Sequence, residues 1–549
     1  TLDHDWGTIT WETSGTLVPD SSTVIFRATE SETMVLSGST TFNILTFNID
    51  NTSAGSIREI TVTINSDTTI TTQGTLTFDH DGSDTNDLIT INTGTIEAQG
   101  NSDSTHNGSG AGEVVTGSAT LKINGTGNQT LEGKGGNARS QFVDIDVDKS
   151  SGTLTLSGTI TTEYDWELSQ GTVDAGTSTM VFAESGGGSL TISGSTTFNN
   201  LRFYDSNTAA GSIRDLVVTI PSGTVVTSQG PLTFVHSGTD TNDTITVNTG
   251  VLHAESDIII ESDPTGTEDV NGSATIKLTG TGTQEILQEG TTAPTGSWTI
   301  GKPSGTVTLS GALTLNASNQ DITLTGGTLD LNGHALTVND QFEIGTGTTL
   351  RLHGSQTITG GPDTIWDNTT VHYDDSQGTR TMLNNQFTNL IIGSTGSAIY
   401  HLPGNQTFTG SVTISGGTLA VTNGQTMTVS GSWTQSGGDF TAGSGEVILN
   451  GIGRNITLSG GTFNDLTLDN GLVGYWRLDD GTGSTVARDS SRYANHGTLT
   501  TMDPQSDWIL NTTPAGNTGT TFYNPYSLDF DGSDDYVDVG NNVIFDMDS

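Results

Sequence analysis

The sequence predicts an all-β protein made of tandem repeats, with a β-solenoid as the favoured architecture. Apolar and polar residues alternate in short runs bounded by Gly, Ser, Asn or Asp, as in Thr153-Leu-Thr-Leu156 and Val217-Val-Thr-Ile220, and such alternation is typical of β-strands. Helical periodicity is nowhere sustained, and the frequent Thr, Val and Ile disfavour helix. A long stretch is also duplicated, because the run Ser37-Gly-Ser-Thr-Thr-Phe-Asn-Ile-Leu-Thr-Phe47 returns in nearly the same form at Ser193–Phe203, 156 positions later (193 − 37).

The duplication divides the chain into five parts. They are copy 1 (1–158), copy 2 (159–311), a diverged β region (312–430), a partial copy 3 (431–470) and a C-terminal segment (471–549). The offset between copies falls from 156 at Ala54/Ala210 to 153 at Gly152/Gly305, so small deletions have accumulated in connecting loops. Long internal repeats are typical of modular architectural or binding proteins.

A finer repeat inside the copies predicts the solenoid. Gly-Thr-Leu, Gly-Thr-Ile and Gly-Thr-Val phrases begin at Gly74 and Gly94 and at Gly152 and Gly171. A spacing of about 20 residues fits one coil of a β-solenoid, in which every coil stacks on the last and buries a shared core. The alternative is a string of β-sandwiches, which short strands separated by frequent turns also permit.

The phrase Gly327-Thr-Leu-Asp-Leu-Asn-Gly-His-Ala-Leu-Thr-Val338 resembles the coils of secreted β-solenoid surface proteins and adhesins. That resemblance implies a repetitive scaffold exposed outside the cell.

The C-terminal segment contains sequence motifs that differ from those of the repeats. Three phrases follow in order, namely Gly471-Leu-Val-Gly-Tyr-Trp-Arg-Leu-Asp-Asp-Gly-Thr-Gly-Ser484, Ala487-Arg-Asp-Ser-Ser-Arg-Tyr-Ala-Asn-His-Gly-Thr-Leu499 and Ser527-Leu-Asp-Phe-Asp-Gly-Ser-Asp-Asp-Tyr-Val-Asp-Val539. They resemble the N-terminal part of a laminin-G-like, concanavalin A-like jelly roll. The resemblance implies an antiparallel extracellular domain that binds glycans or proteins and often holds Ca²⁺, and it makes Asp489 and Asp535 possible Ca²⁺ ligands. The alternative is turn capping by Asp489 and a solvated Asp535.

A second group of possible Ca²⁺ ligands lies in the repeats. The run Asp79–Asp87 is rich in carboxylates and amides, which are oxygen ligands of the kind that Ca²⁺ prefers. The acidic positions that both copies keep are Asp84 and Asp87 in copy 1 and Asp240 and Asp243 in copy 2. Two other acidic positions are lost in copy 2, which favours turns built from Asx side-chain hydrogen bonds. His80 and His236 recur without nearby nitrogen ligands, so a transition-metal site is disfavoured.

Composition excludes several classes of function. The formal net charge of −45 would repel nucleic acid. We expect no membrane insertion within this chain, because no apolar run approaches the length of a membrane helix. Cysteine is absent, so disulfides and thiolate chemistry play no part. We expect no enzyme, because carboxylates are scattered among Thr and Gly and the basic residues that recur, such as Lys149 and Lys302, suit surface or pairing contacts better than two identical active sites.

Trp11, Trp166 and Trp433 each lie near the start of a copy. We interpret them as core or capping residues, with a sugar-stacking platform as the alternative.

Together these features predict an extracellular structural or adhesive protein that forms a stalk, surface layer or filament, with open ends that allow copies to assemble end to end. The alternative is a secreted carbohydrate-binding or carbohydrate-active protein that uses the jelly roll to target glycans. Its partners would be further copies, a glycan or a surface protein, and its only cofactor would be Ca²⁺.

Overall fold

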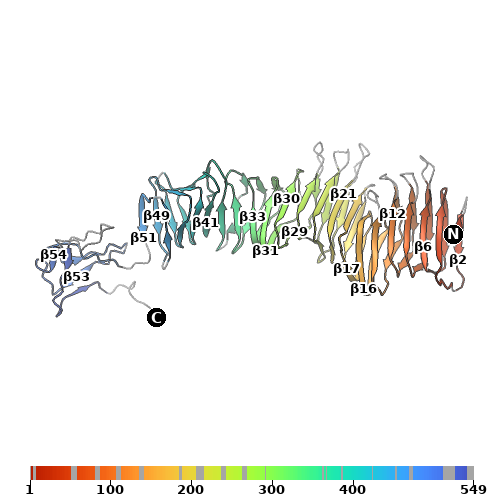
Figure 1. The fold of residues 1–549 in the computed structure, drawn as a ribbon, viewed down its shortest axis with the longest axis horizontal. Coiled ribbons are helices and arrows are strands. Elements are labelled where there is room, and N and C mark those ends of the chain that lie inside the picture. The colour runs from red at the N-terminus through yellow and green to blue at the C-terminus, as the bar shows by residue number, and fades with distance from the viewer. Residues whose placement is uncertain are drawn as a thin grey trace. The chain divides into compact units, whose positions relative to one another are not determined.

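A computed structural model gives the fold (Figure 1). It describes residues 2–3, 8–15, 17–50, 58–80, 87–106, 113–134, 141–184, 188–205, 215–236, 243–261, 269–290, 292–360, 364–365, 368–384, 387–422, 424–451, 454–460, 462–468, 474–491, 493–510 and 526–540. All regular elements in these ranges are β-strands, which confirms the all-β prediction. The chain divides into two compact units, Thr1–Tyr373 and Asp374–Ser549.

Copy 1 is a three-sided stack of parallel coils within the first unit. Successive strands along the chain lie on the first, second and third faces in turn, and each pairs with the strand one coil away. The first face contains β3 (Thr23–Ala28), β6 (Ile44–Ile49), β9 (Leu76–His80), β12 (Ser102–His106) and β15 (Gln129–Lys134). The second contains β2 (Thr8–Glu12), β4 (Glu32–Ser37), β7 (Glu59–Ile64), β10 (Leu88–Asn92) and β13 (Val114–Thr116). The third contains β5 (Thr40–Phe42), β8 (Thr69–Thr72), β11 (Thr95–Ala98) and β14 (Thr120–Ile123). A short strand, β1 (Leu2–Asp3), pairs with β3.

Copy 2 repeats this arrangement strand for strand. Its first face contains β18 (Thr179–Glu184), β21 (Asn200–Asp205), β24 (Leu232–His236), β27 (Ile258–Glu261) and β30 (Gln284–Gln288). Its second contains β19 (Ser189–Ser193), β22 (Leu216–Thr219), β25 (Thr244–Asn248) and β28 (Asp269–Asn271). Its third contains β20 (Thr196–Phe198), β23 (Val225–Ser228), β26 (Val251–Ala254) and β29 (Thr275–Leu278). The duplicated sequence therefore folds into duplicated coils.

No break separates the two copies. The long strand β16 (Asp144–Thr162) pairs with β14 and β15 of copy 1 and with β18 of copy 2, and β17 (Trp166–Asp174) pairs with β16 and then β19. Likewise β31 (Trp298–Leu309) closes copy 2 and pairs with β33 (Ile322–Asp330). The pairing is parallel throughout, as in a solenoid, whereas sandwich sheets are antiparallel. The solenoid prediction is confirmed and the alternative of tandem sandwiches is wrong.

The remaining strands of the first unit continue the stack. They are β32 (Leu313–Leu315), β34 (Leu336–Val338), β35 (Phe342–Ile344), β36 (Thr349–Leu352), β37 (Ile358–Thr359), β38 (Thr364–Ile365) and β39 (Thr370–Tyr373).

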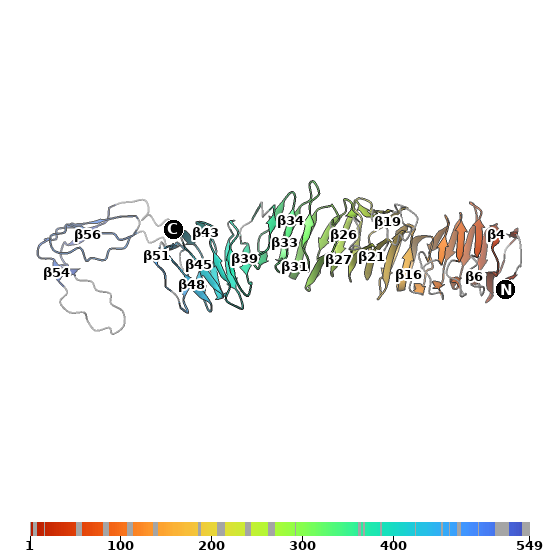
Figure 2. The same ribbon diagram turned by 90° about the horizontal axis from the view of Figure 1, so that it is seen from above.

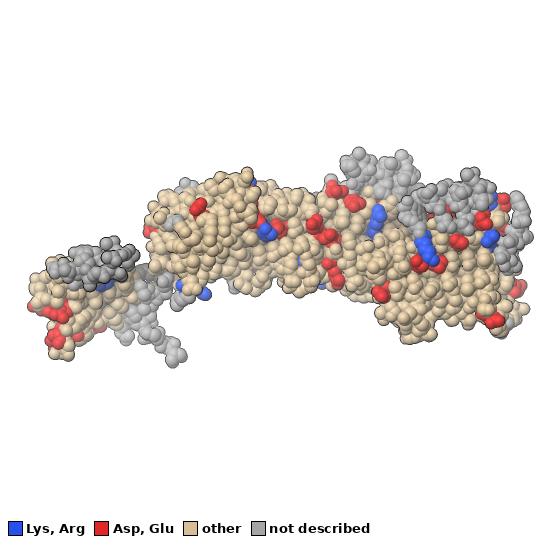
Figure 3. All heavy atoms as spheres, viewed as in Figure 1, with Lys and Arg blue, Asp and Glu red and all other residues tan. Residues whose placement is uncertain are grey.

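Inward-facing residues explain why this sequence forms coils. Each strand buries every second side chain, and equivalent side chains of neighbouring coils lie one above another. The rings of Phe26 and Phe47 stack at 5.8 Å, and those of Phe47 and Phe78 at 5.8 Å. The equivalent rings of copy 2 stack in the same way, with 6.1 Å between Phe182 and Phe203 and 5.3 Å between Phe203 and Phe234. Outward positions carry mainly Thr and Ser, and Figure 3 shows charged side chains scattered thinly over the visible surface.

Coil length differs from the expected 20 residues in much of the two copies. Leu45 pairs with Leu76, 31 positions on (76 − 45), and Leu76 pairs with Ser102, 26 positions on (102 − 76). The structural neighbour of Gly74 is Gly100, not Gly94, and an added Cβ at Gly100 would lie 2.1 Å from the Gly74 carbonyl oxygen. The spacing from Gly152 to Gly171 does mark one coil, because Thr153 pairs with Thr172. The Gly-Thr phrases therefore mark corners on different faces as well as successive coils.

The second unit begins with parallel strands arranged in three rows (Figure 2). One contains β40 (Thr379–Thr381), β42 (Ile399–His401), β45 (Thr418–Ala420) and β48 (Asp439–Thr441). Another contains β43 (Gln406–Phe408), β46 (Thr426–Val429), β49 (Glu446–Leu449) and β51 (Asp465–Leu468). The third runs through β41 (Asn389–Gly393), β44 (Val412–Gly416), β47 (Trp433–Gln435) and β50 (Ile456–Thr457). Coils of 19 to 23 residues form these rows of strands, as shown by the pairs Glu446↔Asp465 (465 − 446) and Trp433↔Ile456 (456 − 433).

Pairing changes from parallel to antiparallel in the C-terminal segment. There β53 (Gly497–Thr500) pairs with β52 (Val486–Ala487) and β56 (Tyr536–Asp538), and β54 (Trp508–Leu510) pairs with β55 (Tyr526–Leu528). A small core of its own contains Ala487, Leu499, Met502 and Trp508. Antiparallel pairing among five short strands does not test the resemblance to a jelly roll, which stays a prediction.

Within the part of the chain that the structure describes, no helix is long and apolar enough to cross a lipid bilayer.

Candidate functional site

Asp489 is a buried carboxylate at the centre of a turn in the C-terminal segment. Asp489 is 5% exposed. Its Oδ1 accepts hydrogen bonds from the backbone amides of Tyr475 (2.6 Å) and Ser491 (2.7 Å), and its Oδ2 accepts from Ser491 Oγ (2.5 Å) and the Asn495 amide (2.8 Å). Burial by itself would raise the pKa of Asp489, but these four donors outweigh it and lower the pKa to about 2. The geometry is that of the turn-capping alternative, and the calcium role of Asp489 stays a prediction.

Asp535 lies in a separate acidic group. Within the described residues, the carboxylates of Asp531, Asp534 and Asp535 bring potential ligand atoms within 4.8 Å of one another. The Asp531 amide donates to Asp535 Oδ2 (2.9 Å), and the Ser533 amide donates to Asp531 Oδ1 (2.8 Å). Oxygen ligands of this kind suit Ca²⁺. Sequence reasoning selected Asp535 and missed Asp531 and Asp534, although their spacing in a Gly-containing turn was visible.

The structure describes only part of the acidic loops of the two copies. Asp84 and Asp240 lie outside the described residues, whereas Asp87 and Asp243 are each 2% exposed. Asp87 Oδ1 accepts the backbone amide of Arg58 (2.9 Å), which joins two neighbouring coils. It is a contact between coils and not the local hydrogen bond of an Asx turn, so the turn interpretation also stays a prediction. The calcium interpretation of all four residues stays a prediction.

Two histidines meet at the end of the first face in copy 1. The rings of His80 and His106 stack with centroids 4.5 Å apart. Burial lowers the pKa of His80 well below its usual value, with His106 adding to the effect, and burial lowers the pKa of His106 to about 4. Both rings are therefore neutral near pH 7. The sequence did not reveal this pair, because the 26-residue offset (106 − 80) becomes meaningful only once the coil register is known.

Copy 2 has one histidine at this place. His236 is 5% exposed, and neither of its ring nitrogens has a hydrogen-bond partner among the described residues. Burial lowers its pKa, and the charges of Asp243 and Asp269 oppose the effect. The position equivalent to His106 is Ser262 (106 + 156). The histidine pair is therefore specific to copy 1, which is not the pattern of a site that both copies use.

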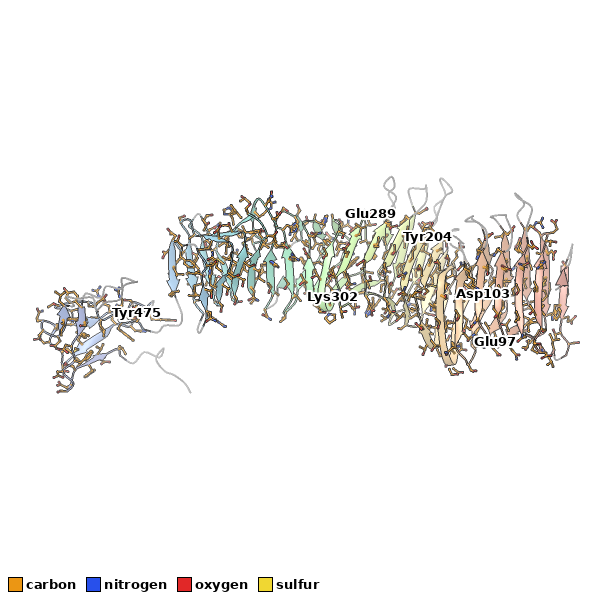
Figure 4. All side chains as sticks on the ribbon, in the orientation of Figure 1. Glu97, Asp103, Tyr204, Glu289, Lys302 and Tyr475 are labelled. Atoms are coloured by element: carbon orange, nitrogen blue, oxygen red, sulfur yellow. The ribbon has the colours of Figure 1, made fainter. Side chains whose placement is uncertain are left out.

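A buried lysine occurs at one corner of both copies. Lys149 is 2% exposed, and its Nζ donates to the carbonyls of Gly125 (2.5 Å) and Gly127 (3.0 Å) and to Gln129 Oε1 (2.5 Å). In copy 2, Lys302 (labelled in Figure 4) is 2% exposed and donates to Gln284 Oε1. Burial lowers the pKa of both lysines. Both lysines make internal contacts between coils, which is the pairing role expected of them.

The tryptophans near the start of each copy, Trp11, Trp166 and Trp433, pack in the coils. Trp166 and Trp433 are each 0% exposed, and Trp11 is half-buried in β2. Trp166 Nε1 donates to Thr196 Oγ1 (3.1 Å). The core interpretation is therefore correct for Trp166 and Trp433, and neither presents a ring face for a sugar.

A cavity lies at the C-terminal end of the coils in the second unit. It has a volume of about 610 Å³ and is lined by Phe440, Thr441, Ala442, Gly443, Thr462, Phe463 and Asn464. The rings of Phe440 and Phe463 also flank Trp433, with centroids 4.9 and 5.4 Å from its own. The Trp433 Nε1 donor has no hydrogen-bond partner among the described residues.

No protein-family model, no curated protein and no solved structure matches this chain.

Proposed function

We propose that the protein is an extracellular structural or adhesive scaffold whose coils supply length and a repetitive surface. The main support for this proposal is which features of copy 1 are kept in copy 2 and which are lost. Both copies keep the strand order, the stacked phenylalanines and the lysine–glutamine contact between coils. The second copy does not keep the histidine pair, the most unusual chemical group of the first. Duplication has therefore preserved an architecture.

Composition supports an extracellular setting. Charged residues make up only 14% of the chain, and Thr- and Ser-rich outward positions give a polar surface with little charge. A net charge of −45 spread over such a surface favours solubility at high local concentration. The resemblance of the C-terminal segment to extracellular jelly rolls points the same way.

Labelling of intact producing cells with antibodies against residues 1–373 tests the proposal. We expect surface labelling that is removed by brief external proteolysis, with a cytoplasmic protein of the same cells as the protected control. Labelling that requires permeabilised cells contradicts an extracellular scaffold.

Carbohydrate binding by residues 471–549 is the alternative function. A glycan array probed with the full chain and with a chain ending at Asn470 separates the two. Glycan binding that disappears with the segment, by a protein that forms no surface structure, would favour the alternative.

A further inference from the structure

The last coil of the solenoid in the second unit leaves apolar residues uncovered. Four apolar side chains of this coil, at positions that are buried in the other coils, are exposed: Ile456 (44%), Leu458 (48%), Leu466 (38%) and Leu468 (52%). In β51, Leu466 and Leu468 pair with Val447 and Leu449, which are 0% and 4% exposed because β51 covers them. Among the described strands, β50 pairs only with β47 and β51 pairs only with β49. The coil therefore combines exposed apolar side chains with two open strand edges.

The internal repeats show what normally covers these positions. By sequence, Ile456, Leu458, Leu466 and Leu468 correspond to Leu190, Ile192, Leu201 and Phe203 of copy 2, which are 2%, 0%, 0% and 0% exposed. There the next coil covers them, with Leu190 paired with Val218 and Leu201 paired with Leu232. The surface is thus built to be covered by the edge of another β-coil.

The cavity at this end has the same origin. Phe198, the copy 2 equivalent of Phe463, pairs with Ser228 of the next coil and is fully buried. Phe463 is half-exposed and lines the cavity of about 610 Å³. The cavity is the space that a further coil would fill.

Charge makes this end suited to self-association. Residues 454–468 contain one Arg and one Asp and are neutral, in a chain whose net charge is −45. Arg454 and Asp465 are both exposed. In a two-fold contact the same surface serves both partners, so a neutral end coil meets a second neutral end coil without the repulsion that a charged surface would cause.

We propose that residues 454–468, which we call the end coil, are an interface through which two copies of this chain pair end to end about a two-fold axis. The axis crosses the face of Thr462 and exchanges the other two faces, so the open edge of β50 in each copy lies against that of β51 in the other. Ile456 and Leu458 of one copy then cover Leu468 and Leu466 of the other. This pairing does not depend on where the protein is located in or outside the cell, so it can fail while the proposed scaffold function stands.

Sedimentation equilibrium of the full chain over a range of concentrations tests the interface. We expect a dimer of the 57.1 kDa chain. Leu466→Glu/Leu468→Glu places four like charges in the contact and should raise the dimer dissociation constant at least tenfold. The matched control is Val18→Glu, because Val18 is 77% exposed but lies in the first coil. A monomeric wild-type chain, or a double variant that dimerises as well as the control, overturns the proposal.

Cross-linking then fixes the orientation. Because the chain has no cysteine, Thr462→Cys introduces a single thiol into the end coil on the face that the axis crosses, and Ser14→Cys introduces one into the first coil. Oxidation should cross-link Thr462→Cys to itself. Cross-links that form only in a mixture of the two variants would indicate head-to-tail stacking and overturn the two-fold arrangement.

Discussion

Lys149 Nζ donates a hydrogen bond to Gln129 Oε1 at 2.5 Å in copy 1, and the same contact joins Lys302 to Gln284 in copy 2. The amide of Gln129 also donates to the carbonyl of Ala98 at 2.9 Å, so one lysine and one glutamine connect three consecutive coils. In copy 2, Gln284 Nε2 donates to Ala254 O at 3.0 Å. A buried ammonium is costly unless its protons are bound, and here carbonyl and amide oxygens accept hydrogen bonds from it.

Lys149→Met should destabilise the surrounding coils strongly. It leaves the carbonyls of Gly125 and Gly127 and the amide oxygen of Gln129 without this donor, at an expected cost of about 2–4 kcal/mol. Hydrogen exchange of residues 120–134 measures the effect locally. Lys122→Met is the matched control, because Lys122 pairs with Asp146 and Asp148 near the surface, where an ion pair contributes about 1 kcal/mol or less. Equal protection in the two variants would contradict the role of Lys149.

The stacked phenylalanines should be equivalent in the two copies. Phe47→Ala and Phe203→Ala each remove a fully buried ring between two others, with an expected loss of about 3–5 kcal/mol. Local hydrogen exchange should show similar losses around β6 and β21. A large loss in one copy and little change in the other would show that the copies are not equivalent coils.

The histidine pair should make copy 1 sensitive to acid. The pKa of His106 is about 4 in the folded protein and 6.5 ordinarily, so the unfolded chain binds more protons between these values. The contribution to stability is complete above about pH 7 and falls as pH drops from 6.5 to 4, by about 3 kcal/mol. Hydrogen exchange around β9 and β12 as a function of pH measures this loss. His106→Ser, the residue that copy 2 has at the equivalent position, should flatten the profile, and an unchanged profile would contradict the assignment.

Asp489 should act through its hydrogen bonds and not through Ca²⁺. Asp489→Asn replaces one acceptor oxygen by an NH2 group, so two of the four donors lose their acceptor and the melting temperature of the C-terminal segment should fall. Because the pKa of Asp489 is lowered to about 2, its contribution is complete above about pH 4 and is lost as pH falls toward 2. Near-ultraviolet circular dichroism of Trp476 and Trp508 reports on the segment. A chelator that destabilises the wild-type segment as much as Asp489→Asn does would indicate a calcium role.

Much of the fold could be predicted from the sequence because strands and repeats leave local signals. The alternation around Thr153–Leu156 and the return of Ser37–Phe47 at Ser193–Phe203 predicted parallel coils that copy each other. The coil register could not be predicted so well, because Gly occurs at corners on all faces and because long coils carry loops. Contacts that depend on the register, such as His80 with His106 and Lys149 with Gln129, were therefore invisible in the sequence.

The candidate site was less predictable than the fold. Asp489 was identified through its surroundings, but its role depends on the four donors that fold around it. The exposed end coil was predicted only as an open end, since burial of Leu466 and Leu468 depends on a further coil that none of the described residues forms.

Distances across the first face of copy 1 test the central claim that the repeats are successive coils of one parallel stack. The outward positions Thr46, Thr77, Asp103, Glu132 and Ser157 pair one to the next across β6, β9, β12, β15 and β16. Strands lie about 4.8 Å apart, so spin labels at Thr46→Cys should lie about 14 Å from Glu132→Cys and about 19 Å from Ser157→Cys. A stepwise increase of one strand spacing per coil is the predicted result. Distances that do not increase with coil number would contradict the account.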